Sequence, residues 1–130
     1  MAFLWFWLYN LCMNTKTLQT LTDRLWGDYA EIFPRLVRFD PPKILINNRF
    51  SKTAGCNYTE KNEIELAGKF LVQFPENMAR VILPHEIAHQ IDFNLNGWYN
   101  RKQHHGKEWI TIMLKIGQEP KPFHSMVLKK

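Results

Sequence analysis

A chain of 130 residues, 45% hydrophobic and 22% charged, has the length and composition of one globular domain. Its net charge of +5 is a mild excess, compatible with nucleic acid nearby but too small to be the footprint of a strong nucleic-acid binder. The two cysteines, Cys12 and Cys56, exclude a disulfide framework and a cysteine zinc knuckle, so we expect a reducing, cytoplasmic setting.

Residues 2–12 are apolar and rich in aromatic side chains. This stretch is shorter than the about 20 residues of a membrane span, and it lacks the charged n-region and cleavage site of a secretory signal. Three interpretations compete: Met13 is the true initiator, the stretch is an interfacial anchor, or it packs on the domain. We favour the first, because an amphipathic helix follows Met13 directly, and we divide the chain into an extension (residues 1–13) and a domain (residues 14–130).

That helix is predicted over residues 15–33, since one stripe of apolar side chains runs along it and Pro34 ends it. The stripe consists of Leu18, Leu21, Leu25, Trp26, Tyr29 and Ile32. After a linker closed by Pro41 and Pro42, three strands are predicted, at Lys43–Asn47, 54–59 and Glu63–Ala67. Residues 68–72 fit either a short helix or another strand.

A second long helix is predicted from Pro75 to about Leu95, with Asn96-Gly97 as its C-cap and turn. Pro84 lies inside it and should remove a hydrogen bond or produce a kink. A last helix over residues 106–116 would bury Trp109, Ile112, Met113 and Ile116. Together these elements predict an α+β fold with an N-terminal helix, a small three-stranded sheet, a central helix and a C-terminal helix.

The segment His85-Glu86-Ile87-Ala88-His89 is the strongest chemical signal in the chain. On a helix, His85 and His89 lie at i and i+4 on one face, where both imidazoles can reach one zinc ion. A Glu between two such ligands is the general base of zinc metalloproteases. The pattern therefore predicts a metal site, although two histidines and a carboxylate on a helix also occur without one.

Catalytic zinc sites typically have three protein ligands, so a third is needed. The metzincin continuation is excluded, because it requires Gly and His where this chain has Asp92 and Leu95. A carboxylate ligand could only be Glu108 or Glu119, and the better candidates are His104 and His105, which the loop after Gly97 can return to the metal. Spacing alone does not choose between these two histidines.

Several motifs together carry a family resemblance, in the order Thr53-Ala54-Gly55, Glu63–Ala67, Pro84 to His89, His105-Gly106-Lys107-Glu108-Trp109, Ile116-Gly117 and His124. From about Arg49 to His124 the chain resembles the SprT/Spartan group of zinc metallopeptidases, although it reaches Lys130 without the C-terminal zinc ribbon that many bacterial members carry. The resemblance implies a minimal zincin-like core and a single catalytic Zn²⁺ held by His85, His89 and His105. It also implies Glu86 as general base and, as substrates, proteins crosslinked to or trapped on DNA.

Further expectations complete this hypothesis. Asp92 either orients a ligand imidazole as a hydrogen-bond acceptor or is an exposed helix carboxylate. A strand at residues 54–59 could bind an extended protein or peptide substrate by β-augmentation. We expect a monomer with no stable membrane span. Two alternatives remain: a deformylase-type hydrolase with Cys56 as third ligand, and a non-catalytic, DNA-associated zinc-binding module.

Overall fold

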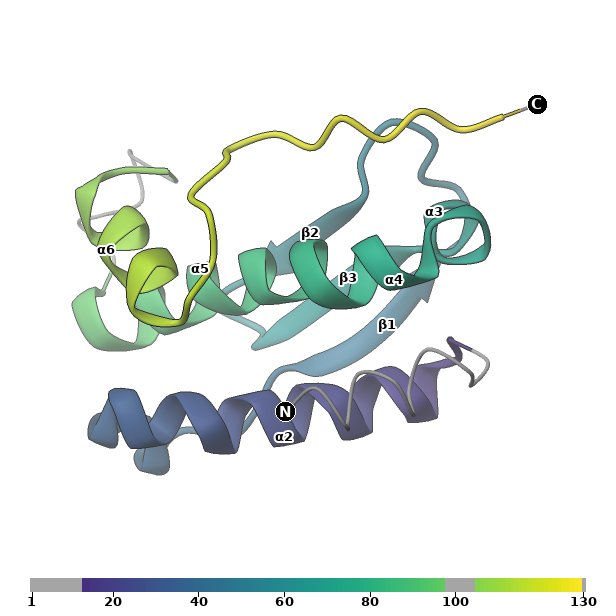
Figure 1. The fold of residues 1–130 in the computed structure, drawn as a ribbon. Coiled ribbons are helices and arrows are strands. Elements are labelled where there is room, and N and C mark those ends of the chain that lie inside the picture. The colour runs from purple at the N-terminus through teal and green to yellow at the C-terminus, as the bar shows by residue number, and fades with distance from the viewer. Residues whose placement is uncertain (1–12, 98–104, 130) are drawn as a thin grey trace.

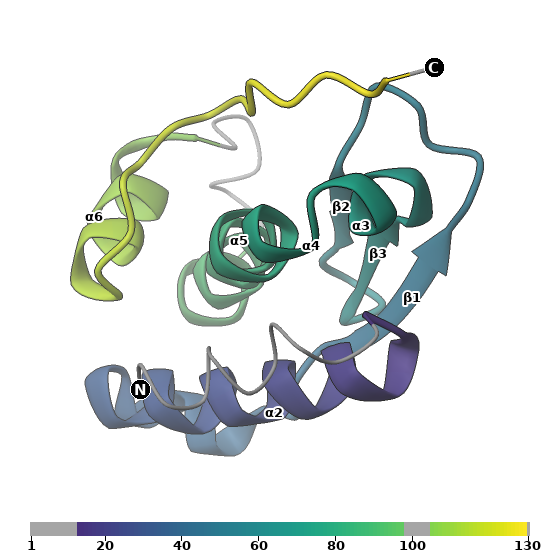
Figure 2. The same cartoon turned by 45° about the vertical axis from the view of Figure 1, so that its right-hand side comes forward.

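The computed structural model describes residues 13–97 and 105–129, which pack around one central helix (Figure 1). Figure 2 looks nearly along that helix, α5 (Leu83–Asn96), with α2 (Thr15–Ile32) beneath it, the sheet on one side and α6 (Lys107–Lys115) on the other. The predicted α+β class is confirmed, and the arrangement is compatible with a minimal zincin-like core.

Helix α2 begins where Asn14 caps it, since the Asn14 side chain accepts a hydrogen bond from the Thr17 N–H at 2.9 Å. Most of its predicted apolar stripe is buried: Leu18, Leu21, Leu25, Trp26 and Tyr29. The prediction for Ile32 is wrong, because this side chain is 44% exposed. The chain leaves the helix at Phe33, and Leu36 of the following 3-10 helix, Pro34–Arg38, enters the core in its place.

The three predicted strands are confirmed and form one sheet in the order β1-β3-β2. Strand β1 (Lys43–Asn47) runs parallel to β3 (Glu63–Ala67), and β2 (Gly55–Tyr58) runs antiparallel to it. Ile44, Ile64 and Leu66 are buried on the face that the helices cover. Strand β2 is therefore an edge strand of this sheet, and it packs against α5.

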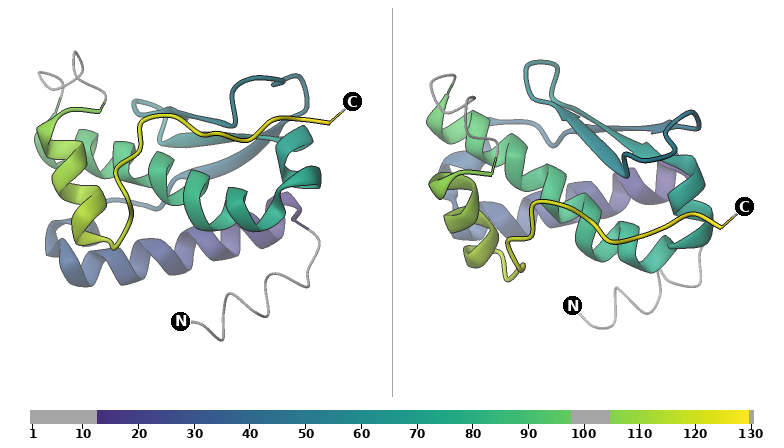
Figure 3. Two further views of the ribbon diagram at one scale, coloured as in Figure 1. Left: turned by 45° about the horizontal axis from the view of Figure 1, so that its top comes forward. Right: turned by 90° about the horizontal axis from the view of Figure 1, so that it is seen from above.

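The segment after β3 is helical rather than extended: α3 spans Gly68–Gln73. Helix α6 buries Trp109, Ile112 and Met113 as predicted, but Ile116 is only partly buried because it is the C-cap residue. Beyond α6, residues 119–129 form no helix or strand and run alongside α5 (Figure 3). Their far end is fixed by Gln73, whose side chain exchanges two hydrogen bonds with the Lys129 backbone at 2.8 and 3.0 Å.

The predictions for residues 1–12 of the extension and for His104 lie outside the described residues. Within residues 13–97 and 105–129, no helix has the length and apolar character needed to cross a bilayer.

Candidate metal centre

The helix that carries the two motif histidines is preceded by a wide turn. Helix α4 (Pro75–Asn77) leads into a π-helical segment, Met78–Ile82, and then into α5. The Leu83 N–H donates to the Met78 carbonyl, five residues back. Pro84 has no N–H, and its ring clashes with the carbonyl of an ordinary helical turn. The disturbance predicted at Pro84 thus takes the form of a π-turn, a feature frequent at functional sites, directly before His85.

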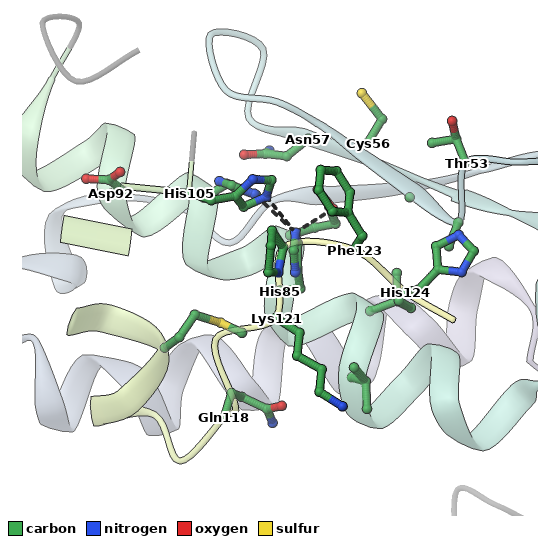
Figure 4. A pocket seen from close by; sticks show the side chains of 18 of the residues that line it. Thr53, Cys56, Asn57, His85, Asp92, His105, Gln118, Lys121, Phe123 and His124 are labelled. Carbon is green, nitrogen blue, oxygen red and sulfur yellow. Dashed lines mark hydrogen bonds and ion pairs between the residues drawn. The ribbon is translucent and has the colours of Figure 1, made fainter. Parts of the chain in front are cut away.

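Three imidazoles, those of His85, His89 and His105, come together beside α5, and Figure 4 labels His85 and His105. His85 Nε2 lies 3.2 Å from His89 Nε2 and 3.3 Å from His105 Nε2. A tetrahedral ion with nitrogen ligands at about 2.0–2.1 Å separates each pair of ligand nitrogens by about 3.3–3.4 Å. Since all three ligand atoms lie within 4.8 Å of one another, these histidines are positioned to bind a metal ion.

Helix α6 delivers the third histidine, because His105 stands just before its N-cap residue, Gly106. The fully buried Trp109, one turn on, contacts all three imidazoles. Its ring is stacked on His89 at a centroid distance of 5.3 Å, and it meets His85 and His105 edge-on at 4.9 and 4.7 Å. The predicted packing role of Trp109 therefore extends to orienting the whole histidine cluster.

The carboxylate of Glu86 lies beside this cluster and is shielded from water. Glu86 is 7% exposed, and its Oε2 is 3.9 Å from His85 Nε2. Strand β2 covers it so closely that a Cβ added at Gly55 would lie 3.2 Å from Glu86 Cγ. Burial raises the pKa of the Glu86 carboxyl to about 8, so this group binds a proton more readily than an ordinary Glu.

The His85 imidazole is held in the form that binds metals. Burial, with a further contribution from His105, lowers its pKa to about 4, although a hydrogen bond to the Lys121 backbone acts in the opposite direction. The ring is therefore neutral near pH 7, as metal ligation requires. Because Nε2 faces the other two histidines, Nδ1 is the nitrogen left to donate to Lys121, which fixes the ring orientation.

With this geometry in view, comparison with known proteins is decisive: the SprT-like family matches residues 23–128. The chain belongs to the SprT-like family. Protein SprT of Actinobacillus succinogenes is 35% identical over 77 residues, which are 58% of this chain and 44% of that protein. Protein SprT of Vibrio parahaemolyticus is 36% identical over 78 residues, which are 60% of this chain and 45% of that protein.

Protein SprT of Escherichia fergusonii is 30% identical over 98 residues, covering 75% of this chain and 58% of that protein. The aligned part of this SprT-like chain thus spans about half the length of the curated relatives it matches. No solved structure matches the chain at a significant level.

Two further residues of this SprT-like chain bear on the ligand set. One interpretation placed Asp92 at the exposed surface of the helix, but its side chain is buried, with 7% exposed. Burial raises the pKa of its carboxyl. Its Oδ1 accepts a hydrogen bond from Asn96 Nδ2 at 2.7 Å. Cys56, the ligand of the deformylase interpretation, points away from the histidines (Figure 4), and burial raises the pKa of its thiol. Among the described residues, His105 rather than Cys56 completes the cluster.

A groove passes over the histidines between two walls. Residues 52–61, including β2, form one wall, residues 118–125 form the other, and α5 forms the floor. Sequence analysis did not predict the second wall. His124, to which no role was assigned, anchors it: Nε2 donates to the Lys52 carbonyl at 3.0 Å, and Nδ1 accepts from the Met126 N–H at 3.1 Å. Phe123 lies over His105 at a centroid distance of 6.0 Å and is 82% exposed.

Proposed function

We propose that this SprT-like chain is a zinc-dependent endopeptidase in which His85, His89 and His105 hold one Zn²⁺ and Glu86 is the general base. The observation that carries the proposal is the spacing of the three Nε2 atoms, 3.2 and 3.3 Å from His85 to its two partners, beside a buried carboxylate in an open groove. A three-nitrogen site with room for a further ligand is the pattern of catalytic zinc.

The ligand chemistry favours zinc among the common metals. Three imidazole ligands suit Zn²⁺ better than the oxygen-seeking Mg²⁺ and Ca²⁺. When bound, Zn²⁺ acidifies a water molecule and polarises a carbonyl. Glu86 accepts a proton from the attacking water and delivers it to the leaving amine nitrogen, a transfer for which a base of raised pKa is suited. Asp92, whose Oδ1 accepts a hydrogen bond from Asn96, is the candidate second acceptor that would orient a ligand imidazole.

The outer edge of β2, next to which no strand lies in residues 13–97 and 105–129, fits an extended peptide. In the antiparallel pair with β3, Ala54 and Ala67 are hydrogen-bonded partners, since the Ala67 N–H donates to the Ala54 carbonyl at 2.8 Å. By alternation, the backbone N–H and C=O groups of Gly55 and Asn57 point away from β3, toward the groove side of the edge. A substrate strand can pair with these groups by β-augmentation, which recognises main chain rather than particular side chains.

The substrate class follows from this mode of binding and from the family. Main-chain recognition supports a protein or peptide substrate. The Spartan resemblance supports, more narrowly, proteins crosslinked to DNA. We propose that the enzyme acts on them as a monomer in the cytoplasm. The net charge of +5 is compatible with DNA association.

The test begins with zinc content, by elemental analysis of the wild type, His105→Ala and Glu86→Gln purified side by side. We expect about one zinc per chain in the wild type and in Glu86→Gln, and a marked loss in His105→Ala. Cleavage of a protein crosslinked to DNA should fall by roughly 10²–10⁴-fold in Glu86→Gln. Full zinc occupancy with no cleavage by the wild type would instead support a non-catalytic zinc-binding module, and a wild type unable to bind zinc would refute the metal site.

A further inference from the structure

Two contacts join strand β2 to α5, and the first leaves little space for a side chain. A Cβ at Gly55 would lie 3.2 Å from both Glu86 Cγ and Ile82 Cγ2, and 3.3 Å from Leu66 Cδ2. These distances are tighter than ordinary van der Waals contact. The β2 backbone therefore lies directly against the Glu86 side chain, and only glycine leaves it there undisturbed.

The second point is a hydrogen-bonded contact two residues along the strand. Asn57 Nδ2 donates to Gln90 Oε1 at 2.9 Å and to the Glu63 carbonyl at 3.0 Å. Gln90 is 1% exposed, and its Nε2 donates to the Thr59 carbonyl at 3.0 Å and to Asn94 Oδ1 at 2.9 Å. The buried amide of Gln90 thus joins α5 to the β2–β3 hairpin through both of its polar atoms: Oε1 accepts from Asn57, and Nε2 donates to Thr59.

The two contacts match in spacing. Gly55 and Asn57 are two residues apart on a strand, a distance of about 6.6–6.8 Å. Glu86 and Gln90 are four residues apart on one face of α5, a rise of about 6 Å. A shift of β2 along the helix would break the hydrogen bond and the close contact together, so the pair of contacts defines one register between strand and helix.

The same two residues of β2 present, along the outer edge of the sheet, backbone groups that pair with no other described strand. We propose that Gly55 and Asn57 are positioning residues, which hold that edge in a fixed register with the metal centre and so determine which peptide bond of a bound strand lies over it. The proposal rests on the proposed function for its substrate. It extends that function by assigning the choice of bond to the contact between β2 and α5, not to a side-chain pocket.

The cleavage test compares Asn57→Ala and Gly55→Ala with Tyr58→Phe. The control removes the hydrogen bond from Tyr58 Oη to Glu65 Oε2, 3.1 Å, on the opposite face of the same strand. The substrate is an extended peptide of fixed sequence. We expect the zinc content of all three variants to equal that of the wild type. In the first two, kcat for the wild-type bond should fall about 10- to 100-fold, and mass spectrometry should show cleavage at neighbouring bonds. Cleavage of the same single bond with wild-type kcat and KM would overturn the proposal.

A second measurement needs no activity. Hydrogen exchange of the Cys56 and Tyr58 amides, which by the same alternation face β3, should be about tenfold faster in Asn57→Ala than in the wild type or Tyr58→Phe, because β2 opens locally once it is released from Gln90, while α5 exchanges as before. Unchanged exchange would show that the contact does not hold the strand and would refute the proposal. A wild type that cleaves nothing would refute the proposed function, and the exchange result would still decide whether β2 is held.

Discussion

Replacing Glu86 by Gln should stabilise the metal-free protein, and the gain should grow with pH. Burial raises the pKa of this carboxyl from the ordinary 4.5 to about 8 in the folded chain. The folded state therefore retains a proton that the unfolded state releases, and stability is lost as pH rises from the unfolded pKa through the folded pKa. The linked free energy is about 3 kcal/mol at pH 7 and approaches about 5 kcal/mol above pH 8. Gln has a similar shape and no charge to bury, so it avoids this loss.

The assay is urea denaturation of chelator-treated wild type and Glu86→Gln at pH 5, 7 and 8.5. The difference in unfolding free energy should be small at pH 5 and widen in favour of the variant at each higher pH. Glu31→Gln, at an exposed position of α2, is the matched control for loss of a carboxylate at the surface. Added zinc should narrow the gap, because a nearby cation favours the ionised carboxylate. If the difference in unfolding free energy stays constant from pH 5 to pH 8.5, the claim that the Glu86 carboxyl is shielded from water in the folded chain is refuted.

Three further substitutions test the scaffold. Trp109→Ala should lower the unfolding free energy by roughly 3–5 kcal/mol and weaken zinc binding, measured by denaturation and zinc titration; retained affinity would show that the histidines need no aromatic support. Cys56→Ala should keep full zinc content by elemental analysis, whereas loss of metal would revive the deformylase interpretation. Asn14→Ala should cost about 1 kcal/mol in a urea titration, because it leaves the Thr17 N–H uncapped, and no change would mean that Asn14 does not cap α2.

Features that depend on the periodicity of a single helix or strand could be predicted from the sequence. The apolar period of α2, the three strands and the i, i+4 placement of His85 and His89 follow from local backbone geometry. Ile32 shows the limit of that reasoning: its place in the stripe is correct, but the helix ends beside it, and Leu36 fills the core. The π-turn before Pro84 is another limit, because a missing N–H indicates a disturbance without specifying its form.

Contacts between distant segments were much harder to predict. Spacing left His104 and His105 equal, and the family resemblance, not geometry, favoured His105. The structure supplies a physical basis for that choice, since Trp109 packs α6 against the imidazoles and places His105 Nε2 3.3 Å from His85 Nε2. The wall formed by residues 118–125 had no signal of its own, because these residues form no regular structure and follow no hydrophobic period.

A single residue, Gly55, links the environment of Glu86, the proposed general base, to the proposed path of the substrate along β2. A methyl group at this position would lie 3.2 Å from Glu86 Cγ, so β2 and that side chain would have to separate by a few tenths of an ångström, and we expect the carboxylate to become better hydrated. The burial that raises the Glu86 pKa would be reduced, and the outer edge of the strand would move away from the histidines in the same step. Removal of the Asn57 hydrogen bond should loosen β2 at that residue, while the Gly55 backbone two residues away still covers Glu86. If so, Gly55→Ala and Asn57→Ala should both alter the choice of bond, but only Gly55→Ala should also reduce the pH dependence of stability that distinguishes Glu86 from Gln.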